Sequence, residues 1–172
     1  KYFKKMSNQL SEQELLRRQK LIDLKAMGIN PYPPEEYTTN ATALDIKENY
    51  ERDKLNYKDI SVAGRIMSVR DMGKACFAVI QDSTGLVQLY VRRDDICPDE
   101  DKSLYDMVRK TLIDLGDIIG VKGYVLTTKT GEISIHVTSL TLLSKSLEPL
   151  PVVKTDETGK SFDEVSDPEF RF

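Results

Sequence analysis

Several residue types are scarce in this 172-residue chain, and each scarcity narrows what the chain can be. It contains no tryptophan and only two cysteines, Cys76 and Cys97, at no metal-ligand spacing. Cys76 falls in an alternating pattern, where we expect a small buried hydrophobe. A disulfide framework is therefore not expected, and a reduced, cytoplasmic compartment fits. No apolar run approaches the roughly 20 residues of a membrane helix, and the polar N-terminus lacks the apolar region of a secretion signal.

Groups suited to catalysis are equally scarce. The only histidine, His136, lies in an alternating run and is expected to be a satisfied sheet residue rather than a ligand. The acidic run DDICPDED, residues 94–101, does not have the spacing of a calcium loop and is expected to be a solvated loop before a helix. No phosphate-binding loop, GxSxG motif or paired Cys and His set occurs. We predict a binding module with no catalytic residue, metal or cofactor of its own.

Charge is unevenly distributed along the chain. The formal net charge is -3, yet residues 1–27 carry seven basic and three acidic side chains, whereas residues 147–172 carry three basic and seven acidic ones. An acidic total therefore does not exclude a polyanionic partner, although any contact surface must be local.

Local patterns divide the chain into four parts. Residues 1–5 are expected to be an expression remnant before a natural start at Met6, and residues 6–57 a helix and a connector. Ser11 and Glu14 form a capping box, and Gly28 and Pro31 end the helix. Its Arg17, Arg18 and Lys20 are expected either on a solvated face or against a phosphate backbone. Residues 58–148 form the main domain, and residues 149–172 a linker into a further domain.

Five runs within the main domain have the period of two that is typical of strands. They are residues 60–69, 76–82, 86–91, 118–127 and 133–143, and a helix, SLYDMVRKTLIDLG, is expected between the third and fourth. Five strands with one helix in this place predict a mainly β fold with flanking helices, the OB-fold Greek-key barrel. In that fold, strands two and three and the loops joining strands one to two and four to five bind oligonucleotides or oligosaccharides.

Four side chains converge on that face. Alternation places Phe77 and Gln88 outside the barrel, and Arg70 and Lys74 flank the predicted first turn. An exposed aromatic ring can stack on one base of a single strand, while an amide and a guanidinium can hydrogen-bond its edge. Each residue alone could be an ordinary sheet or loop residue, but together they favour a nucleic-acid surface.

The motifs GRIMSVRDMGKACF, LVQLYVRRDD, DLGDIIGVKG, TKTGEISIHV and LLSKSLEPLP occur in an order that resembles the N-terminal anticodon-binding domain of class II lysyl-tRNA synthetases. The closing DPEFRF resembles the lead into their catalytic domain. The resemblance implies that Phe77 stacks on the central uridine of the tRNA(Lys) anticodon and that Arg70 and Gln88 hydrogen-bond it. It also implies that Glu132 contacts the first anticodon base, and Lys74 is expected near a phosphate.

Two positions depart from that family. Val69 stands where relatives often carry a basic residue, and Asp71 where an apolar one is usual, so both lower the positive potential. The resemblance implies that a longer protein attaches lysine to tRNA with ATP and Mg²⁺ in the cytoplasm, as a homodimer and without a membrane. Two alternatives remain: the equivalent domain of an aspartyl- or asparaginyl-tRNA synthetase, or a protein-interaction domain with the OB-fold.

Overall fold

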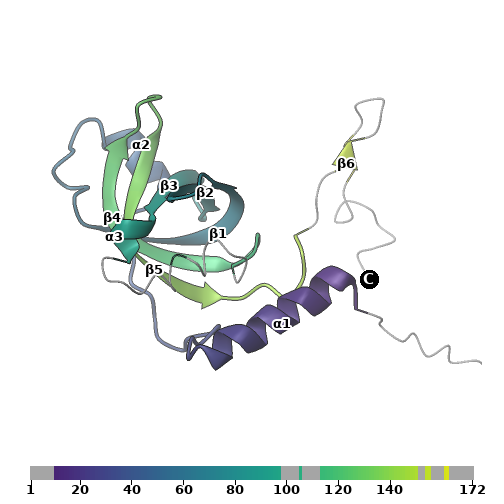
Figure 1. The fold of residues 1–172 in the computed structure, drawn as a ribbon. Coiled ribbons are helices and arrows are strands. Elements are labelled where there is room, and N and C mark those ends of the chain that lie inside the picture. Colours follow the sequence, from purple (N-terminus) through teal and green to yellow (C-terminus); the bar gives the residue numbers. More distant parts are fainter. Residues whose placement is uncertain (1–9, 98–104, 106–112, 151–153, 156–160, 163–172) are drawn as a thin grey trace, which may run out of the picture.

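A five-stranded barrel forms the centre of the molecule. The computed structural model describes residues 10–97, 105, 113–150, 154–155 and 161–162. Its main strands are β1 (Ile60–Asp71), β2 (Ala75–Gln81), β3 (Leu86–Arg92), β4 (Ile118–Thr127) and β5 (Ile133–Ser144). They close in the order β1-β2-β3-β5-β4, and only the β3–β5 pair within the barrel is parallel (Figure 1). The predicted OB-fold barrel is confirmed.

Side-chain alternation separates the barrel core from its outer face. In β2, the side chains of Cys76, Ala78 and Ile80 are buried, whereas Phe77 and Val79 are only partly so. Burial, followed by the nearby charge of Asp71, raises the pKa of the Cys76 thiol to about 11. Cys76 is therefore the small, unreactive core residue that the pattern predicted, because a protonated thiol is a poor nucleophile.

Glycine permits the closest approach between the last two barrel strands. The β4–β5 register shifts between Lys122 and Gly123, and Gly123 pairs with Val137. A Cβ atom at Gly123 would overlap the backbone carbonyl oxygen of His136. This position of the bulge therefore requires glycine, and the missing side chain lets β4 lie close against β5.

The N-terminal helix α1 (Glu12–Ala26) begins as predicted, but two of its basic side chains are buried. Ser11 accepts from the Glu14 amide and Glu14 accepts from the Ser11 amide, so the capping box is confirmed. However, Leu15 and Ile22 are 54% and 58% exposed, whereas Arg17 and Lys20 are 6% and 8% exposed. The expectation of a solvated or phosphate-binding face was therefore wrong for Arg17 and Lys20, since both turn toward the barrel.

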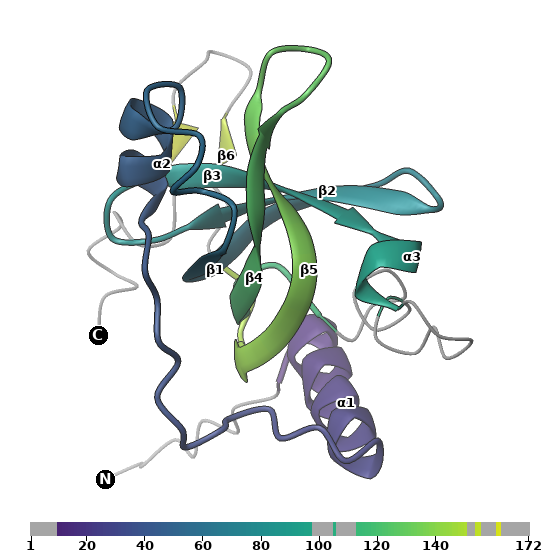
Figure 2. The same cartoon turned by 90° about the vertical axis from the view of Figure 1, so that its left-hand side faces the viewer.

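Polar contacts hold α1 beneath the barrel (Figure 2). The Arg17 guanidinium donates to the carbonyl oxygens of Leu115 and Ser146 at 2.9 and 3.1 Å. Lys20 Nζ lies 2.5 Å from Asp114 Oδ1. Asp114 Oδ2 in turn lies 2.6 Å from the fully buried Lys145 Nζ, which also contacts Asp117 Oδ2 at 2.8 Å. We call Lys20, Asp114, Asp117 and Lys145 the ion cluster.

The remaining elements are short. Helix α2 (Ala43–Asn49) lies within the connector, and it begins at the Thr42 cap. Helix α3 (Arg93–Ile96) occupies the start of the acidic run, so the expected loop was wrong there. Strands β6 (Lys154–Thr155) and β7 (Ser161–Phe162) pair with each other. The predicted helix SLYDMVRKTLIDLG falls largely outside the described residues. Within the described part of the chain, no helix is both long and apolar enough to cross a membrane.

Candidate nucleic-acid interface

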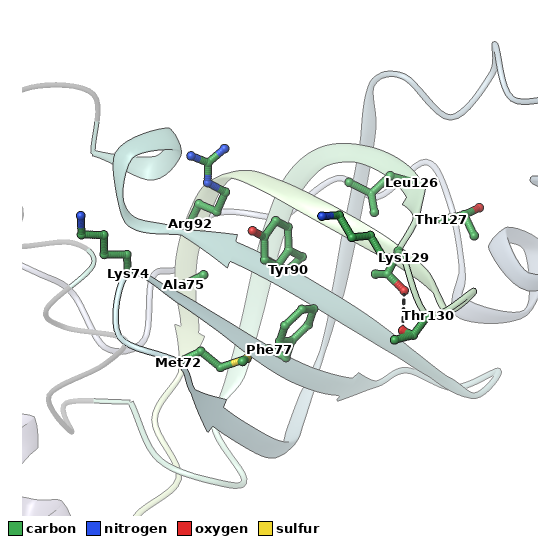
Figure 3. Close-up of a pocket in the computed structure, with 11 residues that line it drawn as sticks. Met72, Lys74, Ala75, Phe77, Tyr90, Arg92, Leu126, Thr127, Lys129 and Thr130 are labelled. Atoms are coloured by element: carbon green, nitrogen blue, oxygen red, sulfur yellow. Dashed lines mark hydrogen bonds between the residues drawn. The ribbon is translucent and has the colours of Figure 1, made fainter.

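A pocket of about 630 Å³ opens on the outer face of β2 and β3. Its floor is formed by side chains of β2 and β3, and its walls by the β1–β2 turn and by Leu126–Thr130, the end of β4 and the start of the loop before β5 (Figure 3). We call Leu126–Thr130 the hairpin wall. The lining residues outside it are Met72, Lys74, Ala75, Phe77, Tyr90 and Arg92. This volume lies within the range usual for ligand pockets.

Phe77 lies at the centre of three neighbouring strands. It pairs with Arg70 on β1 and with Tyr90 on β3. The Arg70 guanidinium carbon lies 5.5 Å from the centroid of the Phe77 ring, a cation–π distance. The Tyr90 ring centroid lies 5.0 Å from that of Phe77, with the planes tilted by 31°. The structure thus brings Arg70 and Phe77 together, and adds Tyr90.

Gln88 lies on the same face, two residue pairs further along, opposite Val79 rather than Phe77. Its side-chain Nε2 donates to Ser134 Oγ on β5 at 2.8 Å. With the amide nitrogen turned toward the buried Ser134, the amide oxygen is left to accept hydrogen bonds elsewhere. Gln88 is therefore oriented by β5, and it does not line the pocket.

Lys74 extends from the β1–β2 turn and lines the pocket. Gly73 has a φ of 85°, a conformation that glycine adopts without strain. Asp71 Oδ1 accepts from the Gly73 amide at 2.8 Å, so this carboxylate stabilises the turn that presents Lys74. We expected Asp71 only to weaken the positive potential. Its carboxylate also has a structural role, because it accepts from the Gly73 amide in this turn.

Glu132 is exposed in the loop between β4 and β5 and is not among the pocket-lining residues. Its backbone is fixed: the Thr128 amide donates to the Glu132 carbonyl at 2.9 Å, and the Glu132 amide donates to Thr128 Oγ1 at 3.0 Å. The structure therefore brings Glu132 to the pocket wall through its backbone, but leaves its carboxylate outside the pocket.

Comparison with known proteins shows what the residues around this pocket are similar to. Residues 60–143 match a family of OB-fold nucleic acid binding domains. The chain is 53% identical to the lysine–tRNA ligase of Porphyromonas gingivalis strain W83 over 165 residues, 95% of the chain and 28% of that protein. Nearly the whole chain is thus similar to a part of this lysine–tRNA ligase.

Two further lysine–tRNA ligases agree with this relationship. The protein of Azobacteroides pseudotrichonymphae is 52% identical over 163 residues, 95% of the chain and 32% of that protein. The protein of Christiangramia forsetii is 47% identical over 169 residues, 98% of the chain and 29% of that protein. The chain thus spans about a third or less of the length of the curated relatives it matches, and its OB-fold domain accounts for residues 60–143.

Among the pocket-lining residues, sequence reasoning had named only Lys74 and Phe77. Those it missed include one aromatic and two basic side chains: Tyr90, Arg92 and Lys129. Tyr90 lies two residues after Gln88 and so shares its face by alternation, but only the strand register shows that it pairs with Phe77. Lys129 lies in the TKTGE loop, which the sequence had already placed between β4 and β5. The charges of Lys74, Arg92 and Lys129 together make this pocket basic in a chain that is acidic overall.

His136 is a satisfied sheet residue, as predicted. The residue is 7% exposed, and its Nε2 lies 2.6 Å from Asp95 Oδ2 of α3. It stacks on Tyr124 at 4.7 Å between centroids, with the planes 11° apart. Among the described residues, no group of three or more His, Cys, Asp or Glu side chains could hold a metal ion.

Proposed function

We propose that this chain is the anticodon-recognition module of a lysine–tRNA ligase. The single observation that carries the proposal is the contact of Arg70 with Phe77, a ring in the floor of a basic pocket, in residues that match OB-fold nucleic acid binding domains. The relatives named above are lysine–tRNA ligases, which supports lysine rather than another amino acid.

Recognition would follow from the arrangement of three side chains. The central base of the anticodon stacks on the Phe77 ring, and the Arg70 guanidinium, already beside that ring, donates to the base carbonyls. The Gln88 amide oxygen accepts from the base N–H, because its amide nitrogen donates to Ser134. Stacking thus supplies affinity, and the two polar groups supply preference for uridine.

Electrostatic contacts would position the RNA backbone around that base. Lys74 lies on one wall of the pocket and Lys129 on the other. Phosphate contacts give affinity without sequence preference and weaken as salt rises. Glu132 would contact the first anticodon base as an acceptor, since a carboxylate has no favourable interaction with phosphate.

The test is binding of a synthetic lysine anticodon stem-loop. Phe77→Ala should weaken binding by about 1–3 kcal/mol, because it removes the stacking surface. Leu55→Ala is the matched control, since Leu55 is a hydrophobic residue that is 72% exposed and lies outside the pocket. Isothermal titration calorimetry on the two variants and the unmodified chain gives the comparison.

Three results would contradict the proposal. Equal affinities of Phe77→Ala and Leu55→Ala would exclude Phe77 as the stacking residue. Tighter binding of an aspartate or asparagine anticodon stem-loop would favour the related synthetases instead. Absence of salt-dependent RNA binding would favour a protein-interaction domain.

Functions of the longer protein are a separate part of the proposal. We propose that it joins lysine to tRNA(Lys) with ATP and Mg²⁺ in the cytoplasm as a homodimer, and that the described residues contribute RNA binding but no catalysis. ATP and Mg²⁺ would be held by residues outside this chain.

A further inference from the structure

A row of aromatic rings crosses four strands of the barrel at one level. Phe77 on β2 pairs with Tyr90 on β3, Tyr90 with His136 on β5, and His136 with Tyr124 on β4. Successive ring centroids are 5.0, 5.3 and 4.7 Å apart. The row runs across the β-strands. Neighbouring bases of a single-stranded nucleic acid could therefore lie along it on this face.

Tyr90 is supported from the neighbouring strand β5. The His136 ring meets it edge to face, with the planes 83° apart. His136 is itself fixed by Asp95 on one side and by Tyr124 on another. A ring whose orientation is already set loses little freedom on binding, so more of its stacking energy contributes to affinity.

Tyr90 also faces an open part of the pocket. Both Phe77 and Tyr90 line the pocket and neither is fully buried. In Figure 3 the two rings lie side by side, and Lys129 reaches from the hairpin wall toward Tyr90. Arg92, two residues after Tyr90 on the same face of β3, lines the same pocket. A second base on Tyr90 would thus lie near two cations suited to its phosphate.

We propose that Tyr90 is a second stacking platform, which binds the base next to the one on Phe77. This inference rests on the proposed function, because it takes Phe77 as the platform for the central anticodon base. The two rings would then bind two consecutive nucleotides of a single-stranded loop, and the hairpin wall would cover the second.

The experiment is a cycle of protein variants and RNA lesions. Tyr90→Leu should raise the Kd of the lysine anticodon stem-loop about tenfold, whereas Tyr90→Phe, which keeps the ring, should leave it nearly unchanged. Stem-loops with an abasic nucleotide at the centre, or at either neighbour, then locate the contact. The Tyr90→Leu effect should persist with the abasic centre and vanish with one abasic neighbour.

Several results would overturn the proposal. Loss of the Tyr90→Leu effect with the abasic centre would mean that Tyr90 only supports Phe77. Equal losses of affinity in Tyr90→Phe and Tyr90→Leu would assign the effect to the hydroxyl group. No loss of affinity in Tyr90→Leu would show that Tyr90 does not contact the RNA.

If Tyr90→Leu melts at a lower temperature, Tyr90→Thr gives a second ring-free variant with a side chain suited to a strand.

Oligouridine separates this inference from the proposed function. The second platform is supported if Tyr90→Leu weakens oligouridine binding and if this loss persists when one nucleotide is abasic but its neighbour keeps its base. This holds even if the chain shows no preference for the lysine anticodon. A lysine preference that depends on Phe77 but not on Tyr90 overturns only the second platform. No binding of either RNA overturns both.

Discussion

At the scale of single residues, the orientation of Gln88 depends on a residue that never faces the pocket. Ser134 is fully buried on β5, and its hydroxyl accepts from the Gln88 amide at 2.8 Å. The same hydroxyl lies 3.4 Å from the Glu132 carbonyl oxygen, a long contact toward the loop. An amide held in one orientation distinguishes a base N–H from a base lone pair, whereas a freely rotating amide can present either atom.

We therefore predict that Ser134→Ala lowers the preference for uridine at the central anticodon position. The ratio of Kd values for stem-loops with central cytidine and central uridine should fall about fivefold, the effect of one hydrogen bond of about 1 kcal/mol. Ser139→Ala is the matched control, because Ser139 lies on the same strand but is exposed. An unchanged ratio in Ser134→Ala would show that Gln88 does not depend on Ser134.

At the scale of elements, α1 buries two charged side chains, Arg17 and Lys20, together with Leu24. The boundaries were predictable because a capping box and a terminal glycine are local signals. The packing face was not, because the partners of Lys20 and Arg17 include Asp114 and Leu115, almost a hundred positions further along the chain. For the same reason, the pattern placed Phe77 and Gln88 on one face but did not show that Tyr90 pairs with Phe77.

Lys20→Met should destabilise the domain by about 1–3 kcal/mol, since it removes one of the two cations that contact the partly buried Asp114. Lys25→Met makes the same change at an exposed position of the same helix and should alter the unfolding free energy little. Urea unfolding monitored by circular dichroism measures both, with the m-value checked for constancy. Similar losses in the two variants would contradict the assignment of α1 packing to the ion cluster.

At the scale of the whole molecule, carboxylates attach two helices to the barrel. Within the ion cluster, Asp114 contacts Lys20 of α1. Asp82 Oδ2 accepts a hydrogen bond from the Ala43 amide at the start of α2, at 2.7 Å. Burial alone would raise the pKa of Asp114, but hydrogen bonds from Lys145 and then from Lys20 outweigh it, so the pKa lies below its ordinary value of 3.8. Burial likewise opposes a lowered pKa at Asp82, where hydrogen bonds from Ala43, Thr84 and Gly85 outweigh it.

This arrangement predicts acid sensitivity. A carboxylate whose pKa is lowered by folding contributes its full stabilisation above the unfolded value near 4, and loses it as the pH falls through the lower folded value. The unfolding free energy should therefore decline below about pH 4, and less steeply in Asp114→Asn. Urea titrations between pH 7 and pH 3 provide the measurement. Parallel pH profiles for the two proteins would rule out Asp114 as a source of the decline.

The parallel pairing of β3 with β5 also determines when, during protein synthesis, the proposed binding face can form. Tyr90 meets His136, and Gln88 meets Ser134, only across this pair, and β5 is the last barrel strand along the chain. A polypeptide still emerging from the ribosome can pair β1, β2 and β3 before β5 has been synthesised. During translation, the chain would therefore carry the Phe77 ring well before it could orient Gln88 or Tyr90, and selective RNA recognition would begin only after Ser144 has left the exit tunnel.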